Sequence, residues 1–132
     1  MRKYASSFGI SGDNIIMPGY VDDIWKYYKA MDIFLLTSRS EGFSLALLEA
    51  GISSVPLVAS DIPGNDEFIK NGENGFLFSL NDTDELVRII NRLSGDPELR
   101  KDLGRNAFED VRKNYTIEVL AGKMDAFLKS IT

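Results

Sequence analysis

The chain has 132 residues, with 15 Lys and Arg against 20 Asp and Glu, a formal net charge of −5, and neither histidine nor cysteine. Without Cys there is no disulfide, thiolate nucleophile or Cys-ligated zinc, and without His there is no imidazole base or histidine metal ligand. The acidic balance argues against binding to nucleic acid or to anionic membrane surfaces, because both require a basic face.

A single packed domain over residues 1–132 is expected from the length and from a hydrophobic content of 44%. No apolar run reaches the roughly 20 residues that a membrane-spanning helix needs. The first residues also lack the apolar stretch of a signal peptide. These features predict a cytoplasmic protein without a membrane segment of its own.

Four short apolar runs, each bounded by turn residues, predict strands that are buried on both faces. They lie at residues 14–17, 33–36, 56–59 and 76–78. Helical patterns lie between them, at residues 22–31 and 44–52. The apolar stripe of the first helical pattern consists of Ile24, Tyr27, Tyr28 and Met31. The alternation of strand and helix predicts an α/β fold with a parallel sheet of about four strands flanked by helices.

The last third of the chain carries no strand pattern and predicts three successive helices. Asp82 with Glu85 resembles a capping box, Asp96 with Pro97 opens the second helix, and Thr116 caps the third. Apolar residues at helical spacing are expected to face the core. They are Leu86, Ile89, Ile90 and Leu93 in the first helix, Leu99, Leu103, Ala107 and Val111 in the second, and Ile117, Leu120, Ala121, Met124, Phe127, Leu128 and Ile131 in the third.

Residues 34–50 predict a buried strand, a small polar loop and a helix that starts near Gly42. In open parallel sheets, ligands bind outside the carboxyl ends of the strands. The first amides of a helix offer a phosphate both hydrogen-bond donors and the positive end of the helix dipole. The segment therefore predicts an anion site, with donors from the amides of Gly42, Phe43, Ser44 and Leu45.

Two carboxylates flank this helix start. Glu41, at the helix entrance, is either an acid favoured by the helix dipole or a group that accepts hydrogen bonds from ligand hydroxyls. Glu49 has no cation at helical spacing, since its neighbours there are Leu45, Ala46, Ile52 and Ser53. A carboxylate that is neither paired nor solvated is costly. Glu49 is therefore expected to face a polar cleft, a structural partner elsewhere in the chain, or solvent.

Glu41 and Glu49 are separated by seven residues, with Gly42, Phe43 and Ser44 after the first. This pattern resembles the E-x7-E motif of the retaining glycosyltransferases of family 4, the glycosyl transferases group 1. The resemblance covers nearly the whole chain in the family's order, through residues 14–21, 30–38, 56–65 with Glu67, and 71–77. It implies the GT-B fold, in which two Rossmann-like domains face a cleft, with this chain as an N-terminally truncated part of the C-terminal, donor-binding domain.

The resemblance also implies roles for individual residues in binding a nucleotide-diphosphate sugar, with no metal and no cofactor. The donor sugar would be bound by Glu41, Gly42, Phe43 and Ser44, the diphosphate by Phe43, Ser44, Leu45 and Arg39, the ribose by Glu49, and the base by Gly19, Tyr20 and Val21. The alternative for Arg39 is a solvated surface arginine. Ser54 departs from the family, which usually has glycine in the turn before Pro56.

Family members place two further strands of the same domain, and an entire acceptor domain, before the part that this chain resembles. The parent enzyme would be hexosyltransferase-like and would transfer a sugar to an acceptor hydroxyl during polysaccharide or glycan biosynthesis. This chain alone, without the N-terminal acceptor domain, is expected to be inactive. Its expected partner is the nucleotide-sugar donor.

Two alternatives stand beside this interpretation. The first is a non-catalytic α/β interaction module that pairs through an exposed sheet edge, either with another protein or as a homo-oligomer. The second is another enzyme of sugar nucleotides, such as an epimerase. That enzyme would need an acid and a base on either side of the sugar, and the sequence offers only Glu41 and Glu49.

Overall fold

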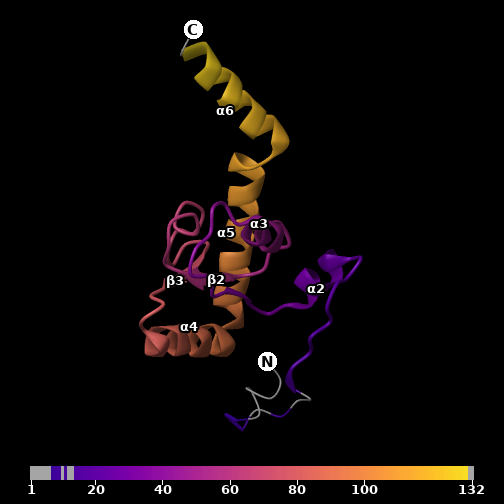
Figure 1. The fold of residues 1–132 in the computed structure, drawn as a ribbon, viewed down its shortest axis with the longest axis vertical. Helices are drawn as coiled ribbons and strands as arrows, with labels where there is room; N and C mark the ends of the chain where they lie inside the picture. Colours follow the sequence, from indigo (N-terminus) through magenta and orange to yellow (C-terminus); the bar gives the residue numbers. More distant parts are fainter. Residues whose placement is uncertain (1–6, 10, 12–13, 131–132) are drawn as a thin grey trace.

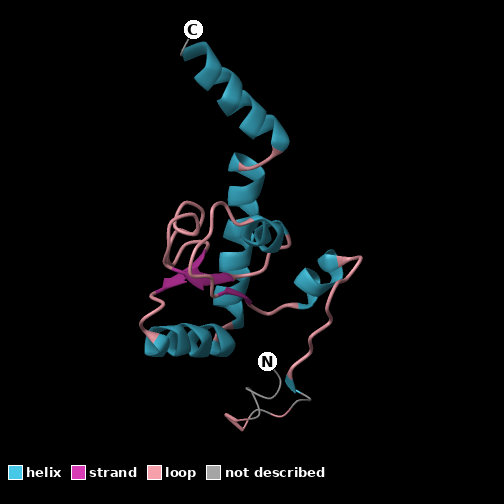
Figure 2. Ribbon diagram, in the orientation of Figure 1, coloured by secondary structure: helices cyan, strands magenta, loops and turns pink. Residues whose placement is uncertain are grey.

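The structure, a computed structural model, describes residues 7–9, 11 and 14–130 (Figures 1 and 2). In chain order its elements are α2 (Ile24–Ala30), β1 (Phe34–Leu36), α3 (Leu45–Ile52), β2 (Leu57–Ser60), β3 (Gly75–Phe78), α4 (Thr83–Gly95), α5 (Pro97–Asn114) and α6 (Ile117–Ser130). The order confirms the α/β class and the run of three helices at the C-terminal end.

The sheet is parallel and has the strand order β1-β2-β3. Phe34 pairs with Leu57, and Leu57 pairs in turn with Gly75. Three of the four expected strands are therefore present. The expectation for residues 14–17 is wrong, because they form no strand and Ile16 is 82% exposed. Within the described part of the chain the outer edge of β1 pairs with no strand, so residues 14–17 are not part of the sheet.

The central strand β2 is buried on both faces and separates two hydrophobic clusters. Leu57 and Ala59 belong to the cluster that α2, α3 and α5 cover. Val58 faces the other cluster, with Phe76 of β3 and with side chains of α4 and α5. This alternation follows from the period of two along a strand. Figure 2 shows α3, α4 and α5 around the short sheet.

The helix α5 contributes to both clusters and begins as the sequence predicts. Asp96 Oδ1 accepts a hydrogen bond of 2.9 Å from the backbone N–H of Leu99, with Pro97 at the first helical position. Asp82 likewise caps α4 by accepting from Glu85 N–H at 2.8 Å. The Glu85 carboxylate, however, accepts from the N–H of Ser79, so the reciprocal half of the expected capping box is displaced.

The turn before β2 is the point where α5 passes closest to the backbone. Ser54 has φ of 60°, and among the described residues it is the only non-glycine with positive φ. The left-handed conformation costs a non-glycine residue about 1–2 kcal/mol, so this turn would suit glycine. Gly104 of α5 lies so near that a Cβ there would be 2.1 Å from Ser54 O.

One expectation about an apolar stripe, that of α6, is wrong. In the stripe of residues 22–31, Tyr28 is buried and Ile24 packs against the core, whereas Tyr27 and Met31 are exposed. The helix α6 forms, but its stripe is not core, since Ile117 is 83% exposed. The stripe residues Leu120, Ala121, Met124 and Leu128 are also exposed. Figure 1 shows α6, in yellow, extending from the end of α5 away from the sheet. The side chain of Phe127 and all of Ile131 lie outside what the structure describes.

Candidate functional site

The loop that carries Glu41 leaves the carboxyl end of β1 and leads into α3. The helix begins at Leu45 and not near Gly42, because Ser44 is the N-cap, with φ of −79° and ψ of 103°. The carbonyl of Ser44 accepts the first bonds, from the N–H groups of Leu47 at 3.2 Å and Leu48 at 3.4 Å. Gly42 and Phe43 are therefore loop residues, and the amides at the helix start are those of Leu45 and Ala46.

The Glu41 carboxylate is half-buried and accepts a hydrogen bond from the Ser38 hydroxyl, with 2.5 Å between Oγ and Oε1. Within the described residues its other oxygen has no hydrogen bond, and neither oxygen accepts from the first amides of α3. Glu41 therefore does not cap the helix, and Oε2 can accept hydrogen bonds from a ligand.

The loop after β2 supports the Glu41 loop from behind. Ser60 Oγ donates to the carbonyl of Ser38 at 2.6 Å, and Asn65 Nδ2 donates to the carbonyl of Ser60 at 2.9 Å. Gly64 packs against the backbone of Gly42, where a Cβ would lie 2.0 Å from Gly42 O, and its φ of 95° also favours glycine. The two loops thus meet through backbone and buried side chains.

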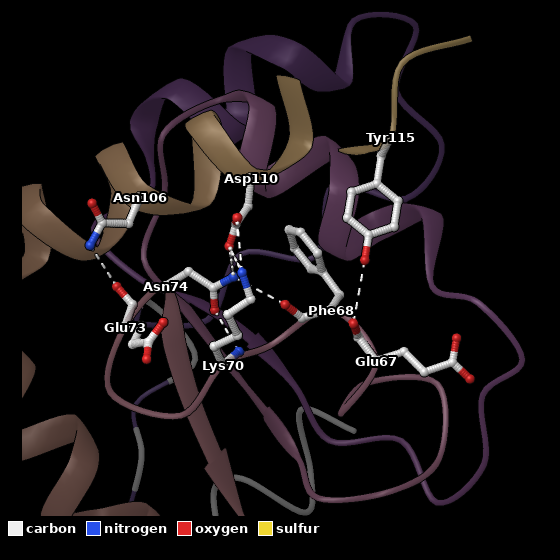
Figure 3. A network of polar contacts seen from close by, with 8 residues as sticks. All are labelled: Glu67, Phe68, Lys70, Glu73, Asn74, Asn106, Asp110 and Tyr115. Atoms are coloured by element: carbon white, nitrogen blue, oxygen red, sulfur yellow. Dashed lines mark hydrogen bonds and ion pairs between the residues drawn. The ribbon is translucent and has the colours of Figure 1, made fainter. Parts of the chain in front are cut away.

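Phe43 is held by an aromatic cluster at the end of α5. Its ring lies 5.6 Å from that of Tyr115, and the Tyr115 ring meets Phe68 edge-on at 5.2 Å. The Tyr115 hydroxyl donates to the carbonyl of Glu67 at 3.3 Å. Figure 3 shows Tyr115 beside Phe68 and Glu67. Burial raises the pKa of Tyr115, with a further contribution from the negative charge of Asp110.

The loop between β2 and β3 is also joined to α5 by polar contacts (Figure 3). Asn74 Nδ2 donates to Asp110 Oδ2 at 2.8 Å and to the carbonyl of Phe68 at 3.0 Å. Lys70 pairs with Asp110 at 3.1 Å, and its N–H donates to Asn74 Oδ1 at 2.8 Å. A surface cavity of about 290 Å³ adjoins Lys70 and Asp110. Its lining does not include Glu41 or Glu49, so this cavity is separate from the predicted site.

Glu49 has the structural partner that the sequence left open. The hydroxyl of Tyr28, in α2, donates to Glu49 Oε2 at 2.9 Å. Burial, this hydrogen bond and the Glu49 charge raise the pKa of Tyr28 to about 12, so the hydroxyl keeps its proton at neutral pH. Glu49 is itself half-buried, and Oε1 has no hydrogen bond within the described residues. Each glutamate thus has one oxygen fixed by a hydroxyl and one that is open.

Within the described residues the remaining predicted residues make no hydrogen bond or ion pair with the carboxylates of Glu41 and Glu49, although Arg39 lies in the Glu41 loop. Tyr20 is 92% exposed, and Gly19, with φ of 70°, belongs to the same segment before α2. No hydrogen bond or ring contact within the described residues joins this segment, including the half-buried Val21, to either glutamate. Arg39 is exposed and makes no ion pair with any described residue.

Sequence reasoning missed Tyr28, Ser38, Ser60 and Asn65 as partners of the site. Ser38 alone had a local signal, because a hydroxyl three residues before Glu41 can reach its carboxylate. The other contacts join residues that are distant in the chain. No group of three or more carboxylates within the described ranges is placed to hold a metal ion. None of the described helices is long and apolar enough to cross a membrane.

The candidate site therefore consists of the amides at the start of α3 and of two carboxylates, Glu41 before the helix and Glu49 within it. Each carboxylate has one oxygen that accepts a hydrogen bond and one that accepts none within the described residues. Carboxylate oxygens suit neutral hydroxyl groups, and the helix start suits an anion. A ligand that carries both hydroxyls and phosphate would match this arrangement.

Comparisons with known proteins agree with the fold. The profile of the family described as Glycosyl transferases group 1 matches residues 1–110. The chain is 36% identical, over 90% of its length, to the lipopolysaccharide core biosynthesis mannosyltransferase LpcC of Rhizobium leguminosarum bv. viciae, and it covers 34% of that relative.

Two solved structures show the same fold. The C-terminal domain of a group 1 glycosyl transferase, LpcC from Francisella tularensis, has a TM-score of 0.77 and 29% identity, with 87% of this chain and 60% of that one covered. A mutant of Staphylococcus aureus TarM in complex with fondaparinux, alpha-GlcNAc-glycerol and UDP has a TM-score of 0.81 and 27% identity, with 95% of this chain and 26% of that one covered. The chain thus spans about a third of its Rhizobium relative, and it belongs to the glycosyl transferases group 1 family.

Proposed function

We propose that residues 1–132 form a domain that binds a nucleotide-diphosphate sugar, as the donor-binding part of a retaining glycosyltransferase. The observation that carries this proposal is the pair Glu41 and Glu49, half-buried on either side of the start of α3, each with one oxygen held by a hydroxyl and one open. The presence of UDP in the TarM complex supports a nucleotide diphosphate as part of the ligand.

The roles follow from the chemistry of each group. Glu41 accepts hydrogen bonds from the hydroxyls of the donor sugar, beside the backbone of Gly42, Phe43 and Ser44. The diphosphate lies at the backbone N–H groups of Phe43, Ser44 and Leu45, where the helix dipole favours negative charge. Arg39 is the cation in the same loop that can turn toward the diphosphate.

Glu49 accepts hydrogen bonds from the ribose hydroxyls through Oε1, while Tyr28 holds Oε2. Gly19, Tyr20 and Val21 contact the base, which requires their exposed segment to approach the bound nucleotide. In the larger enzyme the sugar passes to an acceptor hydroxyl held by another domain. Catalysis then consists of positioning and of stabilising the diphosphate as it leaves, and this chain alone has no transferase activity.

Calorimetric titration of the chain with UDP, UDP-glucose and GDP-mannose tests the proposal. At least one nucleotide sugar should bind. Glu49→Gln should weaken its binding by about 10- to 150-fold, because a hydrogen bond to a charged group contributes roughly 1.5–3 kcal/mol. Glu73→Gln is the matched control, since Glu73 is exposed and lines the separate cavity beside Lys70 and Asp110.

Two results would contradict the proposal. The first is the failure of the unsubstituted chain to bind any of the three compounds. The second is a Glu49→Gln variant whose affinity equals that of Glu73→Gln while its melting temperature falls. In that case Glu49 would have only a structural role, as the acceptor of the hydrogen bond from Tyr28.

A second function has one specific observation in its favour. Among the described strands, β1 is an edge, and Leu35 on it is exposed. An uncovered edge strand is a template for pairing, so the chain would be an interaction module that pairs with a second copy or another protein. Light scattering tests pairing with a second copy. A chain that stays monomeric at high concentration would contradict pairing between copies.

A further inference from the structure

The Ser38 hydroxyl makes the shortest contact in the site. Its oxygen lies 2.5 Å from Glu41 Oε1, within the range of charge-assisted O–H···O⁻ bonds. A serine hydroxyl has a single proton, so this bond commits it to Glu41 and fixes one carboxylate oxygen. The remaining oxygen, Oε2, is then held in one direction at the site.

The backbone of Ser38 is itself held by a hydrogen bond from Ser60. Its carbonyl accepts from Ser60 Oγ at 2.6 Å, and the carbonyl of Ser60 accepts from Asn65 Nδ2 at 2.9 Å. Ser60 and Asn65 are completely buried, so water does not compete for these groups. The bonds run in one direction, from Asn65 through Ser60 and Ser38 to Glu41.

The backbones of the two loops are also in contact. Gly64 lies between Ser60 and Asn65 in the loop after β2 and contacts the carbonyl oxygens of Glu41 and Gly42, as the position of a Cβ built on Gly64 shows. Residues 60–65 therefore fix the Glu41 loop through both their side chains and their main chain.

We propose that Ser38 is a positioning residue for Glu41, and that Ser60 and Asn65 keep Ser38 in place. This inference rests on the proposed function, in which Glu41 binds the hydroxyls of the donor sugar. It adds a prediction that a general packing role does not make. Because Glu41 contacts the sugar alone, loss of the Ser38 hydroxyl should affect ligands that carry a sugar and spare the free nucleotide.

The test compares UDP-glucose with UDP by calorimetry, for the unsubstituted chain and for Ser38→Ala, Ser38→Thr and Glu41→Gln. Ser38→Ala should weaken UDP-glucose binding by roughly 2- to 10-fold, because the Glu41 side chain must then be ordered when the sugar binds, and leave UDP binding unchanged. Ser38→Thr keeps the hydroxyl and should retain the affinity. Ser40→Ala, an exposed serine of the same loop, is the control.

The outcomes separate this inference from the proposed function. Equal weakening of UDP and UDP-glucose by Ser38→Ala would assign Ser38 a general structural role, and no weakening of either would assign it none. A loss of UDP-glucose affinity in Glu41→Gln with none in Ser38→Ala would overturn the positioning role alone. If Glu41→Gln binds UDP-glucose normally, or if the unsubstituted chain binds neither compound, the proposed function is wrong and the inference is wrong with it.

Discussion

The helices α5 and α6 follow one another in the chain and carry the same kind of sequence pattern, but they differ in what they contact. Both have apolar residues at helical spacing, and both form where that spacing predicts them. Leu103, Ala107 and Val111 of α5 are buried, whereas Ile117 and Met124 of α6 are exposed. Apolar periodicity therefore predicts a helix and its two faces, but not whether another element covers the apolar face.

The difference bears on the candidate site. The side chains of α5 hold the loop after β2 through Asp110, and Tyr115, which follows α5, packs against Phe43 in the Glu41 loop. The support of the site thus comes from the sheet, α2, α3 and α5, and ends at Tyr115. Figure 1 shows that α6 continues beyond this region.

The largest contrast is expected for matched leucines of the two helices. Leu103 is 1% exposed and lies in the cluster with Val58 and Phe76, whereas Leu120 is 45% exposed. Leu103→Ala should lower the free energy of unfolding by about 2–5 kcal/mol, because it leaves a cavity. Leu120→Ala should change it by less than about 0.5 kcal/mol, as surface substitutions do. Urea denaturation of both variants measures the difference. Equal losses would mean that the face of α6 is covered in solution.

A smaller difference in stability is expected when alanine replaces a glycine in each helix, with a loss in α5 and a slight gain in α6. A Cβ at Gly104 would lie 2.1 Å from Ser54 O, whereas a Cβ at Gly122 of α6 meets nothing within 4 Å. Gly104→Ala should destabilise the chain by about 1–3 kcal/mol, because α5 must move away from the turn before β2. Gly122→Ala should raise the helix content slightly, since alanine favours a helix by up to about 1 kcal/mol over glycine. Circular dichroism during thermal unfolding follows both. A neutral Gly104→Ala would contradict the close packing of α5 on that turn.

What the sequence predicted correctly is local. The strands at residues 33–36, 56–59 and 76–78 follow from short apolar runs, and the starts of α4 and α5 follow from Asp82 and Asp96. The run at residues 14–17 is also rich in apolar residues, but a strand must pair with a neighbouring strand, and a sequence pattern does not show whether it does.

The candidate site divides in the same way. The position of Glu41 and Glu49 around the start of a helix at the end of a strand was predictable from the order of the segments. The partner of Glu49 and the support of Ser38 were not, because Tyr28 is 21 residues from Glu49, and Ser60 is 22 residues from Ser38. The helical pattern at residues 44–52 matches α3, with Ser44 as its N-cap, whereas the expectation of a helix start near Gly42 is wrong.

The central claim is that the start of α3 and its two glutamates bind a nucleotide-diphosphate sugar. The most direct measurement is a titration of the isotope-labelled chain with UDP-glucose, followed through the backbone amide resonances. The account predicts that the largest changes occur at residues 41–46 and at Glu49, while the amides of α6 remain unchanged. Changes concentrated on α6 or around the cavity beside Asp110, or no changes at all, would contradict it.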